Sequence, residues 1–253
     1  MQTYQFQPPQ FSVAPASTPS GVVFETSFHR PQDWNQTNSA DWYPNAFGTM
    51  PGVGRHGGWL APGGVGDEII DAANYPGGAG GKGFRHYRGN GQNTGGGGLG
   101  ISFPAPIQKF WLRMYMRYSA GFAWTNGSPH YIKDHYYQGG FGQPIFGYYG
   151  GWGFNANGAN LGGSVTWAQS QGGTLGSGLW NCYEYHLDQA TGKIQFWFNN
   201  QLALDVTGAN LGAPGLQYFA LGENQNEGTG ANPLHYTDYD DIVISTTGRV
   251  GPL

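Results

Sequence analysis

The stretch Phe110–Tyr118 (FWLRMYMRY) alternates apolar residues with a second set that combines aromatic and cationic side chains. Successive side chains of a strand point to opposite faces, so Trp111, Arg113, Tyr115 and Arg117 share one face. Aromatic rings can stack on sugar rings and on cations, and guanidinium groups pair with carboxylates. This pattern predicts a glycan-binding face. The alternative is a solvated outer face on which long cations cover apolar surface.

Two further stretches carry the same mixture of aromatic, cationic and imidazole groups. In Tyr131–Gln138 (YIKDHYYQ), His135 shares a face with three predicted ligands, and in Trp180–Leu187 (WNCYEYHL), Glu184 and His186 lie together. If these strands are neighbours in one sheet, their side chains line a single groove. The predicted glycan ligands are Trp111, Arg113, Tyr115, Arg117, Tyr131, Lys133, Tyr137 and Glu184.

The same residues raise two catalytic alternatives. A polysaccharide lyase needs a cation to neutralise a uronate carboxylate, and a base and an acid to move protons. A retaining glycosidase instead needs two carboxylates about 5 Å apart. Glu184 has His186 and Asp188 two and four positions later, so no such pair is present and a retaining hydrolase is not expected. The lyase candidates are Arg113 and Arg117 as neutralisers and Lys133, His135, Tyr137 and His186 as proton carriers.

The composition indicates a folded chain with many turns. Of 253 residues, 46 are Gly and 16 are Pro, but only 10% are charged, the net charge is −4, and 15 Phe, 9 Trp and 16 Tyr can build a core. The absence of a basic stripe, with a pI near 5.9, argues against nucleic acid as a partner. No apolar run is long enough to span a membrane. The single Cys182 excludes an internal disulfide framework and is expected to be a buried packing residue rather than a nucleophile.

The elements that must position these residues are predicted to be strands. Helical periodicity is almost absent, and strand-like alternation recurs between Gly-rich turns, which predicts an all-β, two-sheet antiparallel jelly-roll sandwich. The expected strands are Val22–Phe28, Phe84–Arg88, Phe110–Tyr118, Tyr131–Gln138, Trp180–Leu187, Lys193–Asn199, Gln217–Leu221 and Tyr239–Ser245.

One domain is expected over residues 21–253, preceded by an extended Pro- and Gln-rich arm over residues 1–20. The first 20 residues show no signal-peptide pattern. An arm of this kind is normally mobile unless it lies against its own domain or a neighbouring chain, so it hints at a homo-oligomer or another assembly.

The order of these segments resembles the concanavalin A-like lectin/glucanase jelly roll, in particular its laminin-G-like and polysaccharide-lyase branch. The segments that carry the resemblance are VVFETSF, GFRHYRG, FWLRMYMRYSAGFAW, HYIKDHYY, WNCYEYHLDQATGKIQFWFNNQLALDV and YTDYDDIVIST. Trp180, Gly192 and Trp197 stand at the matching places of that branch's paired strands, with Asn199-Asn200 where Asn-Gly or Asp-Gly is usual. The resemblance covers about Val22 to Ser245 and implies two curved antiparallel sheets. The sharper lyase signatures R-x-E-L, Q-I-H and Y-F-K-x-G-x-Y are missing.

The resemblance also implies a structural Ca²⁺ between the first and last strands. Glu25, Asp240 and Asp241 are the candidate oxygen ligands. The alternative is a strand-end turn with solvated carboxylates. The first functional hypothesis is a carbohydrate-binding or structural lectin-like module, extracellular or on a virion surface as a decoration or tail component. The alternative is a polysaccharide lyase that cleaves a uronate-containing glycan by β-elimination.

Overall fold

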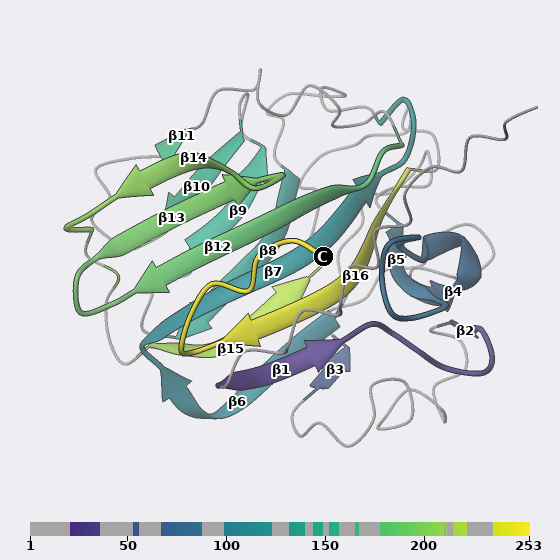
Figure 1. Cartoon of the computed structure of the whole chain (residues 1–253), viewed down its shortest axis with the longest axis horizontal. Helices are drawn as coiled ribbons and strands as arrows, with labels where there is room; N and C mark the ends of the chain where they lie inside the picture. The colour runs from purple at the N-terminus through teal and green to yellow at the C-terminus, as the bar shows by residue number, and fades with distance from the viewer. Residues whose placement is uncertain are drawn as a thin grey trace, which may run out of the picture.

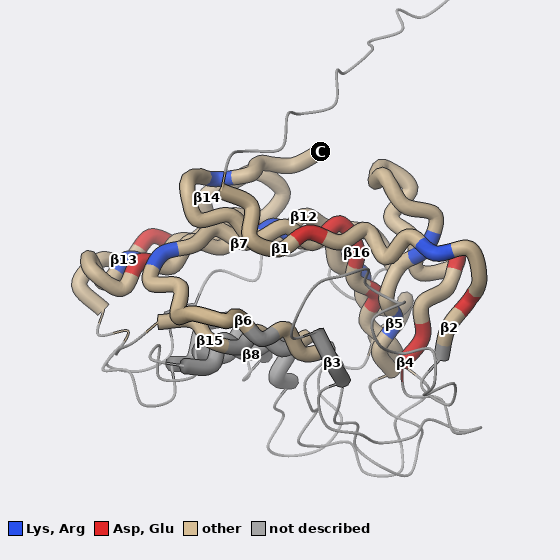
Figure 2. Tube along the Cα trace, turned by 90° about the horizontal axis from the view of Figure 1, so that it is seen from below, with Lys and Arg blue, Asp and Glu red and all other residues tan. Residues whose placement is uncertain are grey.

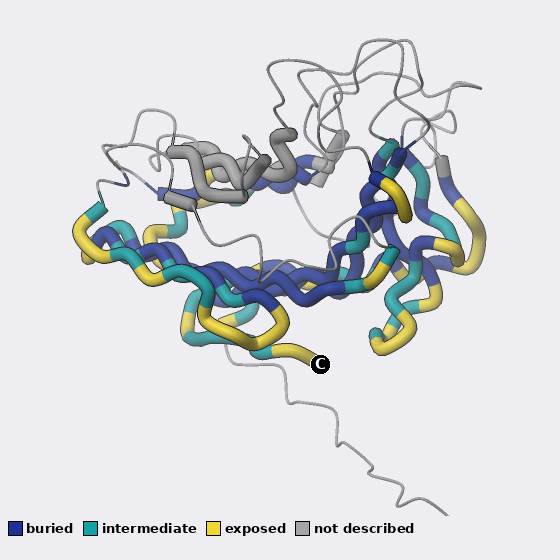
Figure 3. The backbone as a smooth tube through the Cα atoms, turned by 90° about the horizontal axis from the view of Figure 1, so that it is seen from above, coloured by how far each residue is buried: buried dark blue, intermediate teal, exposed yellow. Residues whose placement is uncertain are grey.

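The chain forms two antiparallel β-sheets that face each other across a core (Figures 1 and 3). This confirms the predicted all-β sandwich. The computed structural model describes residues 21–35, 53–55, 67–87, 99–122, 132–139, 144–148, 152–156, 165–166, 178–209, 211, 215–221 and 235–253. The predicted arm, residues 1–20, lies outside these residues.

The larger sheet carries the first and last described strands. Its order is β14-β13-β12-β7-β16-β5-β4-β2, and β1 pairs with β16. A short 3-10 helix, η3 (Asp71–Ala73), opens the connection from β4 to β5. The strands are β1 (Val22–Thr26), β2 (Trp34–Asn35), β4 (Asp67–Ile70), β5 (Gly83–Tyr87), β7 (Lys109–Tyr118), β12 (Asn181–Asp188), β13 (Lys193–Phe198), β14 (Gln201–Val206) and β16 (Tyr236–Ser245).

The smaller sheet has the order β11-β10-β9-β8-β15-β6-β3. Among the described residues, no helix is long and apolar enough to cross a membrane. The strands of the smaller sheet are β3 (Val53–Arg55), β6 (Leu99–Ile107), β8 (Ile132–Gly139), β9 (Pro144–Tyr148), β10 (Trp152–Ala156), β11 (Val165–Thr166) and β15 (Leu216–Leu221).

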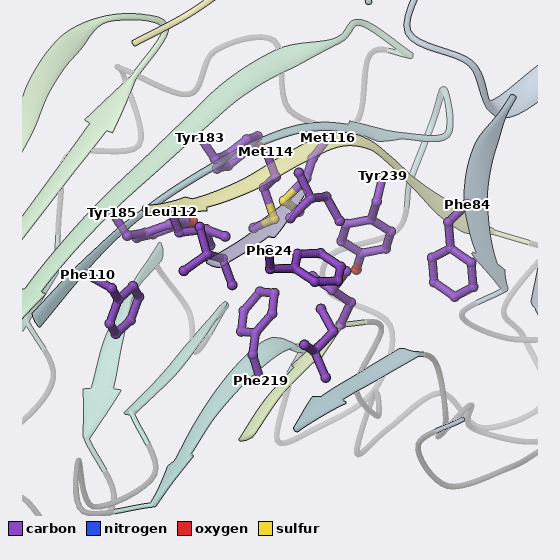
Figure 4. Close-up of a cluster of buried hydrophobic side chains, with 14 of the residues drawn as sticks. Phe24, Phe84, Phe110, Leu112, Met114, Met116, Tyr183, Tyr185, Phe219 and Tyr239 are labelled. Carbon is purple, nitrogen blue, oxygen red and sulfur yellow. The ribbon is translucent and has the colours of Figure 1, made fainter. Parts of the chain in front are cut away.

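The core between the sheets is rich in aromatic side chains (Figure 4). Period-2 alternation in β7 buries its apolar set against Phe219 from β15 of the opposite sheet. Each large ring buries about 150–250 Å², so aromatic side chains can form much of the core in a chain with few aliphatic residues. The ten side chains labelled in Figure 4 are Phe24, Phe84, Phe110, Leu112, Met114, Met116, Tyr183, Tyr185, Phe219 and Tyr239.

Tight turns connect the neighbouring strands β12, β13 and β14. Gly192, which precedes β13, has a φ of +62°. Asn199 and Asn200 join β13 to β14 with φ values of 47° and 69°. Two consecutive positive φ values suit the twist of a two-residue hairpin, and Asn tolerates them better than most residues. These turns place the three strands side by side and fix which residues share the outer face of the larger sheet.

The expected packing role of the cysteine is confirmed. Cys182 on β12 is 4% exposed. Burial, together with the negative charge of Glu184, raises the pKa of its thiol to about 12. A thiol that stays protonated at neutral pH is a poor nucleophile, so Cys182 acts here as a buried packing residue.

Candidate functional site

The predicted ligands on β7 all lie on the outer face of the larger sheet, away from the core. The strand register pairs Trp111, Arg113 and Tyr115 with His186, Glu184 and Cys182 of β12. Paired residues of an antiparallel sheet share a face, so the β7 and β12 candidates do form one surface. This surface divides into regions with different degrees of exposure.

A covering segment, residues 248–253, lies over the middle of this surface (Figures 2 and 3). Nε and Nη2 of the Arg249 guanidinium donate to Oε1 and Oε2 of Glu184, respectively. The Gly251 N–H also donates to Glu184 Oε1, over 2.9 Å. Glu184 is only 1% exposed as a result. This predicted ligand is therefore occupied by the protein itself.

Arg113 and Tyr115 are covered in the same way. Nη1 of Arg113 donates to the carbonyl of Gly251 over 3.3 Å, and the Leu253 N–H donates to the hydroxyl of Tyr115 over 2.8 Å. Tyr75 stacks on Tyr115 with ring centroids 3.8 Å apart. The residues are 5% and 4% exposed. In this structure the covering segment and Tyr75 occupy the space above Arg113 and Tyr115, so the surface is closed at these two positions and their role in glycan binding stays a prediction.

A charge cluster lies at the β5 end of the same face. The buried carboxylate of Asp238 accepts hydrogen bonds from Arg85 Nε over 2.7 Å and from Arg117 Nε over 2.9 Å. The guanidinium of Arg85 also lies 3.6 Å from the ring centroid of Tyr236, and that of Arg117 lies 4.9 Å from Trp180. Arg117, a predicted ligand, is thus held by an internal ion pair, although its side chain remains 21% exposed.

The third region is open and is centred on Trp111. Its indole is half-buried and stacks on the imidazole of His186, with centroids 4.1 Å and planes 4° apart. Nζ of Lys109 lies 5.0 Å from the indole. The register continues this row from His186 to Gln195 on β13 and on to Asp205 on β14. We call these four residues, Trp111, His186, Gln195 and Asp205, the Trp111 row.

Every member of the Trp111 row except Trp111 carries a planar polar group. Nε2 of Gln195 donates to Asp205 over 3.2 Å, and Nδ1 of His186 lies 3.0 Å from the carbonyl oxygen of Phe110. Burial lowers the pKa of His186, and the hydrogen bond to Phe110 opposes this only in part. A neutral imidazole from the neighbouring strand therefore stacks on one face of the indole, and amide and carboxylate groups continue the row. An aromatic platform beside planar polar groups is chemistry that suits a sugar ring.

The lowered pKa values of His186 and His235 predict acid sensitivity. Burial is the first cause of both shifts. The unfolded chain, with an ordinary histidine pKa of about 6.5, binds more protons below that pH, so the free energy of unfolding falls as pH drops through this range. Urea denaturation at neutral and mildly acidic pH measures the loss. We expect His186→Asn to reduce this pH dependence and the exposed-site control His29→Asn to preserve it; equal slopes in all three proteins contradict the assignment.

The calcium candidates lie where β1 meets a bulge in β16. Glu25 of β1 pairs with Val243 of β16. The register between β16 and β7 shifts between Asp240 and Val243. The Asp240 carboxylate accepts the backbone N–H groups of Tyr75 and Asp241, and burial raises its pKa to about 8. Burial likewise raises the pKa of Asp241.

One oxygen in this cluster fits a cation ligand. Oδ2 of Asp241 is buried and has no hydrogen-bond partner, whereas buried polar atoms are normally paired. Glu25 is exposed beside it. Among the described residues, no three or more His, Cys, Asp or Glu side chains are grouped as a metal site. The case for a cation at this position therefore depends on Oδ2 of Asp241, the buried oxygen without a hydrogen-bond partner.

The remaining predicted residues belong to the other sheet. Lys133, His135 and Tyr137 are in β8. The register sets His135 opposite Leu221 and Tyr137 opposite Phe219, and both partners are buried in the core. The side chains of the three β8 residues are not among those described, so their roles stay predictions.

The structure does not bring the lyase candidates together in one sheet. Arg113, Arg117 and His186 lie on β7 and β12 of the larger sheet, and the β8 candidates lie in the smaller one. The outer face that carries Arg113 is separated from the smaller sheet by the core. The condition set from the sequence, that these strands be neighbours, holds for β7 and β12 and fails for β8. Tyr131 lies outside the described residues.

Sequence reasoning missed the residues that contact the predicted ones. Arg249 and Tyr75 cover the predicted surface, and Asp238 binds Arg117. They are distant in sequence from their partners, and no local spacing signals such contacts. Trp197 was detectable, because its alternation within Lys193–Asn199 places it on the face opposite the buried Phe196 and Phe198.

No protein-family model and no curated protein matches this chain. Solved structures do match. The chain is similar to the cellulose induced protein Cip1, with a TM-score of 0.51 at 16% identity, covering 81% of this chain and 90% of that one.

Two further solved structures are similar over much of this chain. One is a mutant of HCR D/C VPI 5995, with a TM-score of 0.52, 10% identity and coverage of 89% of this chain and 49% of that one. The other is a botulinum neurotoxin type C structure described by an interaction with two ganglioside molecules, with a TM-score of 0.50, 11% identity and coverage of 77% and 43%. The chain thus spans less than half the length of these two. At such identities the likeness supports the sandwich fold alone.

Proposed function

We propose that this protein is a carbohydrate-binding module and that the Trp111 row is its glycan site. The observation that carries the proposal is the half-buried Trp111 ring, stacked on neutral His186 and continued by planar polar groups across the sheet. The interaction of a structural neighbour with gangliosides is compatible with this use of the fold. We place the module in the laminin-G-like branch of the concanavalin A-like proteins, as part of an extracellular or virion-surface assembly.

Replacing Trp111 by Ala is expected to weaken glycan binding by at least about 30-fold, because central aromatic anchors contribute about 2 kcal/mol or more to an interface. A glycan array followed by calorimetry on the best ligand measures the loss. Trp197→Ala is the matched control. It also removes an indole from the outer face of the larger sheet, but this indole contacts Arg249 and is not part of the Trp111 row. Glycan binding that survives Trp111→Ala, or that fails equally in Trp197→Ala, rejects the assignment.

The lyase alternative remains a separate proposal with its own test. Incubation with alginate or glucuronan generates an ultraviolet-absorbing unsaturated product if the protein eliminates across a uronate. Product formation that requires Lys133 and Tyr137 establishes the lyase; glycan binding without product formation supports the binding module.

We also propose a structural Ca²⁺ at Asp241, with Glu25 and Asp240 as further oxygen donors. The buried orphan oxygen of Asp241 supports it. A cation present at about 100 times its dissociation constant stabilises the fold by about 2.7 kcal/mol, which corresponds to a rise of about 5–10 °C in Tm for a chain of this size. Thermal melts with Ca²⁺ or with a chelator measure the shift. We expect Asp241→Asn to abolish the rise in Tm with Ca²⁺ and the exposed control Asp205→Asn to retain it. A wild-type Tm that does not change with Ca²⁺ refutes the site.

A further inference from the structure

The surface beneath the covering segment has the features of a peptide-binding groove. Its floor is formed by Arg113 and Tyr115 of β7, Glu184 of β12 and Trp197 of β13, with Asn200 at the β13–β14 turn. The covering segment runs along the outer side of these strands (Figure 2). The covering segment therefore lies across a floor that carries charged, hydroxyl and aromatic groups.

The groove recognises one side chain in particular. The guanidinium of Arg249 contacts both oxygens of Glu184, and its Nη2 donates to the side-chain oxygen of Asn200 over 2.7 Å. The same group lies 4.5 Å from the ring centroid of Trp197. Fork-shaped contact with a carboxylate and stacking on an aromatic face are both features that distinguish arginine from lysine. The contacts on this surface thus suit an arginine side chain.

The groove also forms hydrogen bonds with the backbone that follows this arginine. The Gly251 N–H binds Glu184, the Gly251 carbonyl binds Arg113, and the Leu253 N–H binds Tyr115. Gly251 has a φ of +77°, which favours glycine at this place. The contacts together specify an arginine followed two residues later by glycine.

The attachment of the covering segment is polar and allows release. Gly251 is half-buried, and Leu253 remains 51% exposed, so little apolar surface holds the segment down. Glu184 faces Arg113 directly in the register. When the segment leaves, Arg113 offers a second guanidinium to Glu184, so the open state keeps a cation next to this carboxylate and avoids the large penalty of a buried unpaired charge.

We propose that this groove is a binding site for an Arg-x-Gly peptide segment, filled here by residues 248–253 of the same chain and, in an assembly, by the same segment of a second copy. Exchange of an identical element between protomers needs no new contacts, because each groove meets the residues that it already binds. The proposal is independent of the glycan site on the neighbouring row.

The test uses full-length protein and a labelled peptide of residues 246–253. Full-length Arg249→Met keeps the groove and weakens its own segment, so we expect saturable peptide binding by fluorescence anisotropy. The double variant Arg249→Met/Glu184→Gln is expected to bind on the order of 100-fold more weakly, since it removes one partner of a buried charged pair. A peptide with methionine in place of its arginine is the second control.

Assembly is tested by mixing full-length Arg249→Met with full-length Glu184→Gln. The first supplies an intact groove and the second an intact segment, so the mixture is expected to form a heterodimer on a sizing column that neither variant forms alone. If Arg249→Met does not fold, hydrogen exchange at the Gly251 amide of the wild type serves instead, and excess peptide is expected to accelerate it. Absence of saturable binding, equal binding by the double variant, or unchanged Gly251 exchange overturns the groove, and a mixture without heterodimer overturns the exchange.

Discussion

Replacing Asp238 by Asn is expected to lower the free energy of unfolding by about 3–5 kcal/mol, because it leaves two guanidinium groups around a neutral amide. Asp238 is fully buried and accepts hydrogen bonds from Arg85 and Arg117. Burial by itself lowers the pKa of Arg85, but the hydrogen bond and charge of Asp238 hold the pKa above its ordinary value. A guanidinium keeps its proton at neutral pH even without a partner, so Arg85 stays charged in the variant and keeps its desolvation cost.

Urea denaturation followed by tryptophan fluorescence measures this loss. The matched control is Asp205→Asn, the same substitution at an exposed carboxylate that pairs with Lys193 on the same sheet. Exposed pairs contribute about 0–1 kcal/mol, so the control is expected to change little. Equal effects in the two variants contradict the view that Asp238 holds β5, β7 and β16 together.

Replacing Gly192 by Ala is expected to lower the free energy of unfolding by about 3 kcal/mol or more, since it adds a steric clash to an unfavourable backbone conformation. Gly192 has a φ of +62° in the turn before β13. A Cβ placed there would lie 2.2 Å from the carbonyl oxygen of Ala209 and 2.5 Å from its nitrogen. Both are backbone atoms, and the Ala209 N–H donates to the Gly192 carbonyl, so relief requires movement of the turn.

The variant Gly208→Ala separates the cost of the backbone conformation from the cost of the steric clash. Gly208 also has a positive φ, +79°, but a Cβ there would meet nothing within 4 Å. Its replacement is expected to cost only the backbone term, about 1 kcal/mol. The measurement is the midpoint of urea unfolding for both variants, and an effect of Gly192→Ala no larger than that of Gly208→Ala shows that the clash with Ala209 is relieved without cost.

The fold class was predictable because strand alternation is a local property. In β7 the sequence pattern assigns apolar residues to one face, and the structure buries them. Several strands of the structure were not expected from the sequence, and for two of them the physical reason is clear. β6 contains Pro104 and Pro106, which are unfavourable in strands, and β14 follows Asn199-Asn200 rather than the stronger Asn-Gly signal.

The site was only partly predictable, because it depends on contacts between distant residues. The pairing of Trp111 with His186 follows from two alternating strands that became neighbours. The burial of Glu184 depends on Arg249, which is 65 residues away. A spacing pattern can state which residues share a face of one strand, but it carries no information on which segment crosses that face.

The sequence by itself determined the sandwich, the aromatic core and the mixed outer face of β7, since these follow from side-chain alternation and turn residues. Only the tertiary structure decided which part of that face is open. Strand order put β7 beside β12 and put β8 in the other sheet. Polar contacts then closed the surface around Glu184 with residues 248–253 and left Trp111 half-exposed. Long-range charge pairing, which no local pattern encodes, made that division.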